Sequence, residues 1–240
     1  MIEFNLIKIS SVGVLLMIHK LLSPDLLIKR NILPDKPAPV TLVGQSVYLK
    51  PLIINRDAQA LFEMSNGSAI VLGDRSMDAY DADHLIWCYM FEGPYKSEED
   101  FTASLQAQVD VSNGLCLCVF DKASDRQIGV TNLMNNHPAH LKIEIGTLWY
   151  SPIAQRTLAN TEATFLMLQH AFGLGYRRVE WKCHAQNARS RRAALRIGFK
   201  FEGIHESHMI IKGCNRDTAW FRILENEWPE VKEKLEKILR

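Results

Sequence analysis

One segment of the sequence carries enough positive charge to bind an anion. Between Tyr176 and Arg196 a single acid, Glu180, stands among seven basic residues: Arg177, Arg178, Lys182, Arg189, Arg191, Arg192 and Arg196. Guanidinium groups hold phosphate or carboxylate oxygens through paired hydrogen bonds, so an anion-binding site is one interpretation. A solvated helix face is the other. RNA is the less favoured ligand, because only Tyr176 and Trp181 supply aromatic rings for base stacking.

The cysteines and histidines form no metal or nucleophile motif. The cysteines are five in number and show no CxxC pair and no zinc spacing: Cys88, Cys116, Cys118, Cys183 and Cys214. We interpret them as reduced and mostly buried thiols of a cytoplasmic protein. Cys116 and Cys118 would share one face of a strand. No spacing of histidines and carboxylates supports a metal ion, so no metal is expected.

The composition excludes several classes of protein. The 240 residues, 47% hydrophobic and 23% charged, fit one large or two small folded domains. Disorder, a collagen-like repeat and a coiled coil are disfavoured. With 28 Lys and Arg against 27 Asp and Glu, the net charge of +1 creates no chain-wide attraction for DNA or acidic membranes. DNA is therefore not an expected partner.

Hydrophobic periodicity predicts an α/β fold with a mixed sheet. Strands are expected at residues 45–52, 115–121, 127–135, 142–150, 178–183, 200–211 and 216–224. Helices are expected from Asn55 or Asp57 to Ser65, from Ser97 to Ser112, at 161–173 and 188–197, and after a cap at Asn226. Gly198 is expected to end the helix at 188–197. Residues 66–95 are expected to be irregular.

Residues 1–40 are expected to form an N-terminal extension and Pro-rich linker, ahead of a domain at 41–240. The uncharged run Ile9–Ile18 is far shorter than the ~20 residues of a membrane span, so no integral span is expected. No small-residue cleavage site supports a signal peptide, and a helix lying on a membrane surface is a further alternative. Three prolines predict a stiff linker: Pro34, Pro37 and Pro39.

Four pieces of sequence occur in an order that resembles one enzyme family. They are Glu144–Tyr150 (EIGTLWY), Gln155–Ala163 (QRTLANTEA), Asn187–Phe199 (NARSRRAALRIGF), and Arg216–Phe221 (RDTAWF) followed by Glu227–Pro229 (EWP). Together they resemble the GNAT acyl-CoA N-acetyltransferases, and most closely the branch of ribosomal-protein alanine acetyltransferases of the RimJ/RimL type. The likeness extends over residues 41–235.

The resemblance implies the GNAT fold, a mixed sheet of about seven strands with helices on both faces and a splayed fourth and fifth strand. It implies an acetyl-CoA-dependent N-acetyltransferase that transfers an acetyl group directly to a primary amine in a ternary complex. The amine would be a protein N-terminus or a small molecule. A non-catalytic acyl-CoA-binding or regulatory module with the same fold is the alternative. A homodimer is compatible with both.

The resemblance also implies where coenzyme A binds. The backbone of Leu148, Trp149 and Tyr150 would pair with pantetheine, and one N–H would polarise the thioester carbonyl. The other expected cofactor-binding residues are Gln155, Arg156, Thr157, Leu158, Ala159, Asn160, Thr161, Asn187, Ser190 and Arg192. The pyrophosphate is expected on the N–H groups of residues 156–161, at the positive end of a helix. An exposed loop is the alternative there, and helix capping is the alternative for Asn187.

The loop departs from the family pattern Gln/Arg-x-x-Gly-x-Gly/Ala, because Leu158 and Asn160 occupy the two small-residue positions. Glycine permits close backbone approach or positive φ. Asparagine tolerates the left-handed region and leucine does not readily. We expect a variant turn rather than compromised cofactor binding, because the start of the following helix is intact.

The resemblance gives three catalytic candidates. Glu144 is the expected base, acting directly or through water. Ser190 is the expected donor to the leaving thiolate, and His208 would orient or deprotonate the amine. A tyrosine that many family members use as the acid is replaced here by Ala194. The alternatives are a solvent-facing strand residue for Glu144, a helix cap for Ser190 and a surface histidine for His208.

The acceptor side is expected to contain aromatic residues and the last hairpin. Trp87, Tyr89, Phe91 and Tyr95 would wall it, and the alternative is that they belong to the core. His205 and Asp217 lie on the hairpin that borders the acceptor groove in this fold, and Asp217 is an expected substrate-binding residue.

Overall fold

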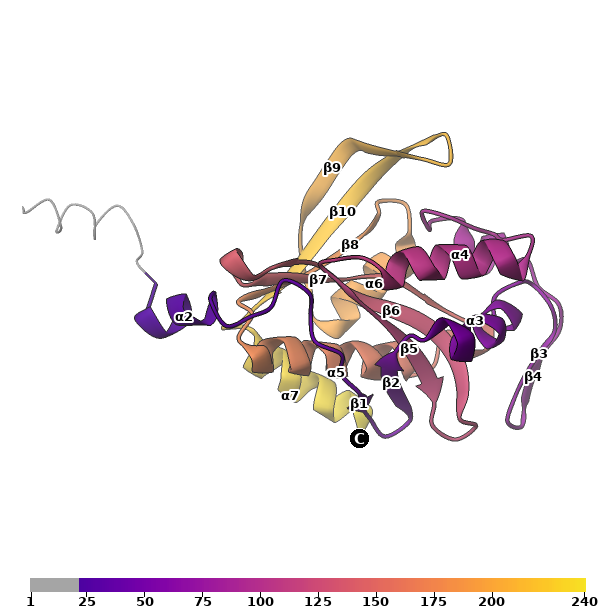
Figure 1. The fold of residues 1–240 in the computed structure, drawn as a ribbon, viewed down its shortest axis with the longest axis horizontal. Helices are drawn as coiled ribbons and strands as arrows, with labels where there is room; N and C mark the ends of the chain where they lie inside the picture. Colours follow the sequence, from indigo (N-terminus) through magenta and orange to yellow (C-terminus); the bar gives the residue numbers. More distant parts are fainter. Residues whose placement is uncertain (1–21) are drawn as a thin grey trace, which may run out of the picture.

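A mixed sheet of eight strands is the frame of the computed structural model, which describes residues 22–240 (Figure 1). The strands of the structure are β1 (Leu42–Val43), β2 (Val47–Pro51), β3 (Ile70–Leu72), β4 (Arg75–Met77), β5 (Leu115–Asp121), β6 (Arg126–His137), β7 (Lys142–Tyr150), β8 (Arg178–His184), β9 (Lys200–Ile211) and β10 (Cys214–Leu224). The order in the main sheet is β1-β2-β5-β6-β7-β8-β10-β9, and β3 and β4 form a separate hairpin. Neighbours pair antiparallel except β7 and β8, which are parallel.

Helices cover both faces of this sheet. The α-helices are α2 (Pro24–Lys29), α3 (Ile54–Glu63), α4 (Glu98–Val109), α5 (Ala159–Leu174), α6 (Ala188–Ile197) and α7 (Trp228–Leu239). Three short helices complete the set: the π-helix η1 (Asp83–Trp87) and the 3-10 helices η2 (Pro138–His140) and η3 (Pro152–Ala154). Helices α5, α6 and α7 contribute to one hydrophobic core, and α3, α4 and η1 to another on the opposite face. The fold is therefore a sheet between two helical layers.

Strand β5 shows why the central strands are apolar along their whole length. Successive side chains of a strand point to opposite faces. Leu115, Leu117 and Val119 join the core under α5, and Cys116, Cys118 and Phe120 join the core under α3 and α4. The two cysteines share a face, as predicted. Burial raises the pKa of Cys116 to about 12, so this thiol stays protonated and unreactive.

Several predicted elements have the observed bounds. The predicted limits of β5, β7, α6 and β9 are those of the structure. Gly198 ends α6 in the left-handed conformation, with φ of 114°. The main sheet has eight strands instead of about seven, because the pair of residues in β1 adds one.

Other predictions about local structure were wrong. Residues 66–95 are not wholly irregular, since they contain the β3–β4 hairpin and η1. The cap of α7 is Glu227 and not Asn226. Helix α3 has Ile53 at its N-cap, and the Asp57 carboxylate accepts from the Ile53 N–H at 2.9 Å from inside the first turn. Helix α4 ends at Val109, three residues before the predicted end at Ser112.

The predicted linker runs along the domain and makes contacts with it. Leu33 and Val40 pack against the larger core. The amide of Asn136 donates to the carbonyl oxygens of Pro34 at 2.8 Å and Asp35 at 2.9 Å. The run Ile9–Ile18 lies outside the described residues. Within residues 22–240, no helix has the length and apolar character needed to cross a membrane.

A buried carboxylate joins the β1–β2 turn to the first turn of α5. Glu162 is 3% exposed. Its Oε2 accepts from the N–H groups of Ser46 at 2.9 Å and Val47 at 3.1 Å, and its carboxylate also accepts from the Gln45 N–H and the Ser46 hydroxyl. Charged acceptors make the stronger hydrogen bonds. Glu162 therefore holds the edge of the sheet against the helix that begins at the cavity described below.

The Glu162→Gln variant should lose about 1–3 kcal/mol of unfolding free energy, because an amide cannot accept four hydrogen bonds as a carboxylate does. Urea denaturation followed by circular dichroism measures the change. The matched control is Glu236→Gln in α7, whose partner Lys232 is exposed, and it should change stability by less than about 0.5 kcal/mol. Equal stability of the two variants would contradict the role given to Glu162.

Candidate active site

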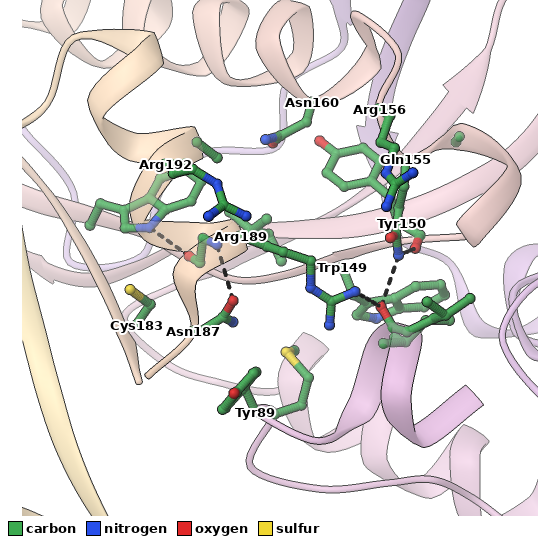
Figure 2. A pocket seen from close by; sticks show the side chains of 18 of the residues that line it. Tyr89, Trp149, Tyr150, Gln155, Arg156, Asn160, Cys183, Asn187, Arg189 and Arg192 are labelled. Carbon is green, nitrogen blue, oxygen red and sulfur yellow. Dashed lines mark hydrogen bonds between the residues drawn. The ribbon is translucent and has the colours of Figure 1, made fainter. Parts of the chain in front are cut away.

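A cavity of about 880 Å³ opens where β7 and β8 move apart (Figure 2). Its walls come from β7, β8, the starts of α5 and α6, and the segment around η1. This volume lies in the range of about 300–1,000 Å³ that is usual for small-molecule sites. The cavity is therefore the candidate active site.

The cavity exists because the two parallel strands pair over only a short length. Lys142–Glu144 of β7 pair with Arg178–Glu180 of β8, and the pairing stops there. Beyond that point β8 pairs only with β10, up to the His184–Thr218 pair. Residues 145–150 of β7 keep a strand partner on the β6 side alone. Backbone N–H and C=O groups are obligatory hydrogen-bonding groups, so this free edge can pair with an extended ligand.

Buried ion pairs stand at the branch point of the two strands. Lys182 Nζ lies 2.7 Å from Glu144 Oε2 and 3.5 Å from Glu180 Oε2. Arg178 Nε lies 2.7 Å from Glu180 Oε1. Burial raises the pKa of Glu180, but the opposing effects of Arg178, Lys182 and Lys142 are larger together and leave this pKa below its ordinary value. Glu180 therefore stays ionised.

A bulge shapes the cavity-lining part of β7. The register of β7 against β6 shifts between the pairs at Val130 and Asn132, and Thr147 has φ of 43°. Positive φ is a strained conformation for a β-branched residue. Asn132 Nδ2 donates to the Thr147 carbonyl at 3.2 Å and holds the bulge. Bulges often redirect backbone groups beside functional sites, and this one lies at the cavity wall.

The start of α5 presents free backbone donors to the cavity. The hydroxyl of Thr157 accepts from the Ala159 N–H at 3.2 Å, and the Glu162 N–H bonds the Leu158 carbonyl at 2.8 Å. The N–H groups of Asn160 and Thr161 lie between them, without a partner among residues 22–240. A helix start with free N–H groups and a positive dipole end suits an anion.

The glycine-poor loop before α5 forms without strain at the two positions in question. Leu158 has φ of −75°, and Asn160 is already helical. The left-handed residue of the loop is Arg156, with φ of 63°. The backbone conformation of the turn therefore needs no glycine at residue 158 or 160.

The charge of the cavity lining is entirely positive. The basic residues among those that line it are Arg156, Lys182, Arg189, Arg192, Arg196 and Arg216, and no aspartate or glutamate lines it. Arg189 is engaged with the protein, donating to the carbonyls of His84 at 2.8 Å and Leu85 at 3.0 Å. Arg196 reaches Thr161 Oγ1 at 3.4 Å. Figure 2 shows Arg156, Asn160 and Arg192 near the start of α5.

The π-helix η1 forms a wall of the cavity away from the start of α5. Side chains from three other segments donate hydrogen bonds to its carbonyl oxygens. Its residues leave carbonyl oxygens free for side chains. Arg189 of α6 and Gln155 both donate to Leu85, and Lys212 of the β9–β10 turn donates to Trp87 at 2.9 Å. Gln155 also donates to the Tyr150 carbonyl at 3.0 Å. Gln155, expected to bind the cofactor, therefore joins the loop before α5 to both β7 and η1.

Most of the predicted cofactor-binding residues meet at this cavity. Leu148, Trp149, Tyr150, Gln155, Arg156, Thr157, Leu158, Asn160, Thr161, Asn187, Ser190 and Arg192 all line it, and Ala159 does not. Asn187 Oδ1 caps α6 by accepting from the Ser190 N–H at 3.0 Å. Ser190 Oγ accepts from Trp181 Nε1 at 3.1 Å, and its hydroxyl also interacts with the Cys183 thiol, where it offsets part of the rise in pKa that burial causes.

The predicted catalytic residues are more dispersed. Glu144 is 4% exposed and lies outside the cavity lining, bonded to Lys182 and to Asn135 Nδ2. His208 lies on the β9–β10 hairpin, which Figure 1 shows projecting from the sheet, and its Nδ1 is 3.0 Å from Thr218 Oγ1. Neither His208 nor His205 lines the cavity, and His205 stacks on Trp220.

The predicted substrate-binding residues divide between the cavity and the core. Tyr89 and Phe91 line the cavity. Trp87 is 3% exposed in the core, and its Nε1 donates to the Ser65 carbonyl at 3.0 Å. Tyr95 packs edge-on against Trp87 and donates to Ser104 at 2.7 Å. Asp217 lies on the hairpin outside the lining and accepts from the Ser207 N–H at 2.7 Å.

Two functional candidates were missed by the sequence analysis. His184 and Arg216 both line the cavity. His184 packs against Tyr89, with ring centroids 5.1 Å apart and the ring planes tilted by 52°, and its Nδ1 accepts from the Gln186 N–H at 3.1 Å. Burial and the nearby charge of Arg216 lower the pKa of His184. The imidazole is therefore neutral at pH 7 and carries its proton on Nε2. The one sequence signal was the position of Arg216 at the start of the RDTAWF motif.

Comparisons with known proteins agree with this arrangement. The family model described as Acetyltransferase (GNAT) domain matches residues 47–200. The chain is similar to the crystal structure of a GCN5-related N-acetyltransferase from Brucella melitensis, with 39% identity, a TM-score of 0.76, and coverage of 85% of this chain and 87% of that one. It is also similar to a probable acetyltransferase (GNAT family) from Chromobacterium violaceum, with 38% identity, a TM-score of 0.71, and coverage of 81% and 90%.

A third solved structure shares the fold at lower identity. It is an acetyl transferase from Salmonella typhimurium that modifies the N-terminal serine of 50S ribosomal subunit protein L7/L12, with 16% identity, a TM-score of 0.62, and coverage of 77% of this chain and 99% of that one. No curated protein sequence matches this chain.

NMR titration should give His184 a pKa below its ordinary value of 6.5, and the Arg216→Met variant should raise it. Without the positive charge of Arg216, the His184 ring is protonated more easily. Burial still disfavours the charged ring, so the pKa stays below 6.5. Because the unfolded chain binds the proton more readily, His184 should reduce stability as the pH falls below 6.5.

His170 in α5 is the internal control. Burial alone lowers its pKa, so the Arg216→Met variant should leave it unchanged. An unaltered His184 titration in that variant, or equal movement of both histidines, would contradict the electrostatic coupling.

Proposed function

Because the chain belongs to the GNAT acetyltransferase family, we propose that it transfers an acetyl group from acetyl-CoA directly to a primary amine, with both substrates bound together. The observation that supports this most is the continuity of one cavity. A free strand edge, a helix start with open N–H groups and a positively charged lining follow one another along its wall. An extended ligand with an acyl thioester at one end and phosphates at the other fits that sequence of groups.

The residues present suit coenzyme A. The N–H groups of Asn160 and Thr161 would hold the pyrophosphate, with Arg156 adding a charge. Arg192 and Arg196 lie at the same end of the cavity and would meet the remaining phosphate. The free backbone edge at residues 146–150 would pair with the pantetheine amides. The amide of Asn187, whose oxygen caps α6, has its nitrogen available to the same arm.

Acetyl-CoA supplies an activated acyl group. The protein must therefore position an uncharged amine, accept the proton that the amine loses and supply one to the leaving thiolate. An α-amine costs about 1 kcal/mol to deprotonate at pH 7 and a lysine about 4.6 kcal/mol, from their ordinary pKa values. A backbone N–H of the bulged segment at Thr147–Leu148 would polarise the reacting carbonyl. Ser190 Oγ, already an acceptor for Trp181, would donate its hydrogen to the departing sulfur.

Glu144 would act through the network at the branch point. It is bonded to Lys182, and Lys182 lines the cavity. Its carboxylate would hold Lys182 in place and receive a proton through water rather than touch the amine. The low cost of deprotonating a peptide α-amine makes this arrangement sufficient for a protein N-terminus.

Release of free thiol from acetyl-CoA tests the proposal. The purified chain should release thiol in the presence of at least one class of primary amine, drawn from N-terminal peptides, amino acids and polyamines, and mass spectrometry should find the acetylated amine. Tight binding of acetyl-CoA with no turnover across the panel would favour a non-catalytic acyl-CoA-binding module. If acetyl-CoA does not bind, both the enzyme and the non-catalytic acyl-CoA-binding module are excluded.

The Arg156→Gln variant should bind coenzyme A about 10-fold more weakly, because one charge-assisted hydrogen bond to phosphate is lost. Isothermal titration calorimetry measures the change. The control is Arg126→Gln on β6, which removes an exposed arginine outside the cavity and should leave the affinity unaltered. Equal affinity for all three proteins would show that Arg156 does not meet the phosphates.

A further inference from the structure

Arg216 is a buried guanidinium without a counter-ion. It lies in β10, is 6% exposed and lines the cavity. Its Nε has no hydrogen-bond partner among residues 22–240. Its Cζ lies 4.4 Å from the centroid of the Phe91 ring. An aromatic face attracts a cation but does not satisfy its N–H donors.

The two carboxylates near Arg216 are occupied elsewhere. Asp217 follows it in sequence, yet accepts from the Ser207 N–H at 2.7 Å and from Asn215 Nδ2 at 3.0 Å. Glu144 raises the pKa of Arg216 from a distance, while its own hydrogen bonds go to Lys182 and Asn135. Burial has the larger, opposite effect and leaves the pKa of Arg216 lowered. A buried charge needs a partner, and the described residues provide none.

The position of Arg216 separates it from the phosphate-binding end. Its charge acts on Cys183 and His184, at the end of β8, and its aromatic neighbour Phe91 belongs to the segment after η1. Figure 2 shows Cys183 and Tyr89 on the other side of the cavity from Arg156 and Asn160. Coenzyme A phosphates held at the start of α5 would therefore leave Arg216 unpaired.

We propose that Arg216 binds a carboxylate carried by the acceptor, so that the acceptor is a primary amine with a carboxylate close to it. This inference rests on the proposed acetyl transfer to an amine. A carboxylate fits better than a phosphate at this end, because its single charge matches one guanidinium. Lys182 is already paired with Glu144, and His184 is neutral. Two sources share this chemistry: a free α-amino acid, and a peptide N-terminus with an acidic residue at its first or second position.

Paired acceptors test the proposal on the full-length protein. One pair is alanine and alaninamide. The other is a C-terminally amidated peptide that begins with Asp-Ala, and its Asn-Ala counterpart. The carboxylate member of at least one pair should have the higher kcat/KM, by about 10- to 100-fold, as expected for hydrogen bonds to a charged group. The pair that shows the preference identifies the source of the carboxylate.

The variants Arg216→Met and Arg216→Lys locate the effect. Arg216→Met should abolish the preference mainly by raising KM for the carboxylate acceptor, and Arg216→Lys should restore part of it by keeping the charge. The affinity for acetyl-CoA should not change. Arg177→Met is the matched control, since the Nε of Arg177 also lacks a hydrogen bond within residues 22–240, but Arg177 lies outside this cavity and 4.0 Å from Glu225 Oε1. The ratio of the kcat/KM values for two acceptors, measured on one variant, does not depend on the fraction of that variant that is folded.

A binding measurement completes the test without turnover. With desacetyl coenzyme A present, titrating alanine or the Asp-Ala peptide should shift the His184 NMR signals saturably, and Arg216→Met should remove that shift. Equal rates for carboxylate and amide acceptors would overturn the inference and leave acetyl transfer intact. If none of the amines is acetylated, the proposed function is overturned. If, in addition, no carboxylate acceptor shifts the His184 signals, this inference is overturned as well.

Discussion

The separation of two parallel strands after three residue pairs is the feature on which the site depends. Strands β7 and β8 are joined at Lys142–Glu144 and then part, and β8 continues with β10 as its partner. An open sheet edge in the middle of a protein would normally be costly, because buried backbone groups must be paired. Here the cost is confined to a wall of the cavity, where a ligand can supply the missing partners. The buried ions around Lys182 mark the point where pairing ends and opening begins.

Charge distribution then divides the cavity into two functional ends. The net charge of the chain is only +1, yet every Asp, Glu, Lys or Arg side chain that lines the cavity is basic, since the nearby Glu144 and Asp217 lie outside the lining and bond other groups. Near the start of α5, backbone donors and several arginines act together on one large anion. Near η1, the guanidinium of Arg189 bonds backbone carbonyls, and that of Arg216 lies beside aromatic rings and a neutral histidine without a counter-ion among residues 22–240. The first environment suits phosphates, and the second suits one carboxylate.

The sequence predicted most of the frame but little of the acceptor end. The bounds of β5, β7 and α6 followed from local periodicity and from Gly198, because neighbours in sequence determine them. The π-helix and the roles of Trp87 and Tyr95 depend on packing between α4 and the sheet, which local patterns do not contain. Arg216 and His184 meet only because β10 pairs with β8 across more than thirty residues. The sequence gives no sign of the positive φ values of Thr147 and Arg156, since neither residue type favours that conformation.

The central claim is that the free edge of β7 and the start of α5 together hold the cofactor through their main chain. Hydrogen–deuterium exchange resolved to single amides tests it most directly, with and without acetyl-CoA. The account predicts slower exchange on binding at one or more amides of residues 146–150 and at Asn160 and Thr161, with little change in β2 and β5. Protection that spares these two segments, or that appears only on the β9–β10 hairpin, would contradict it.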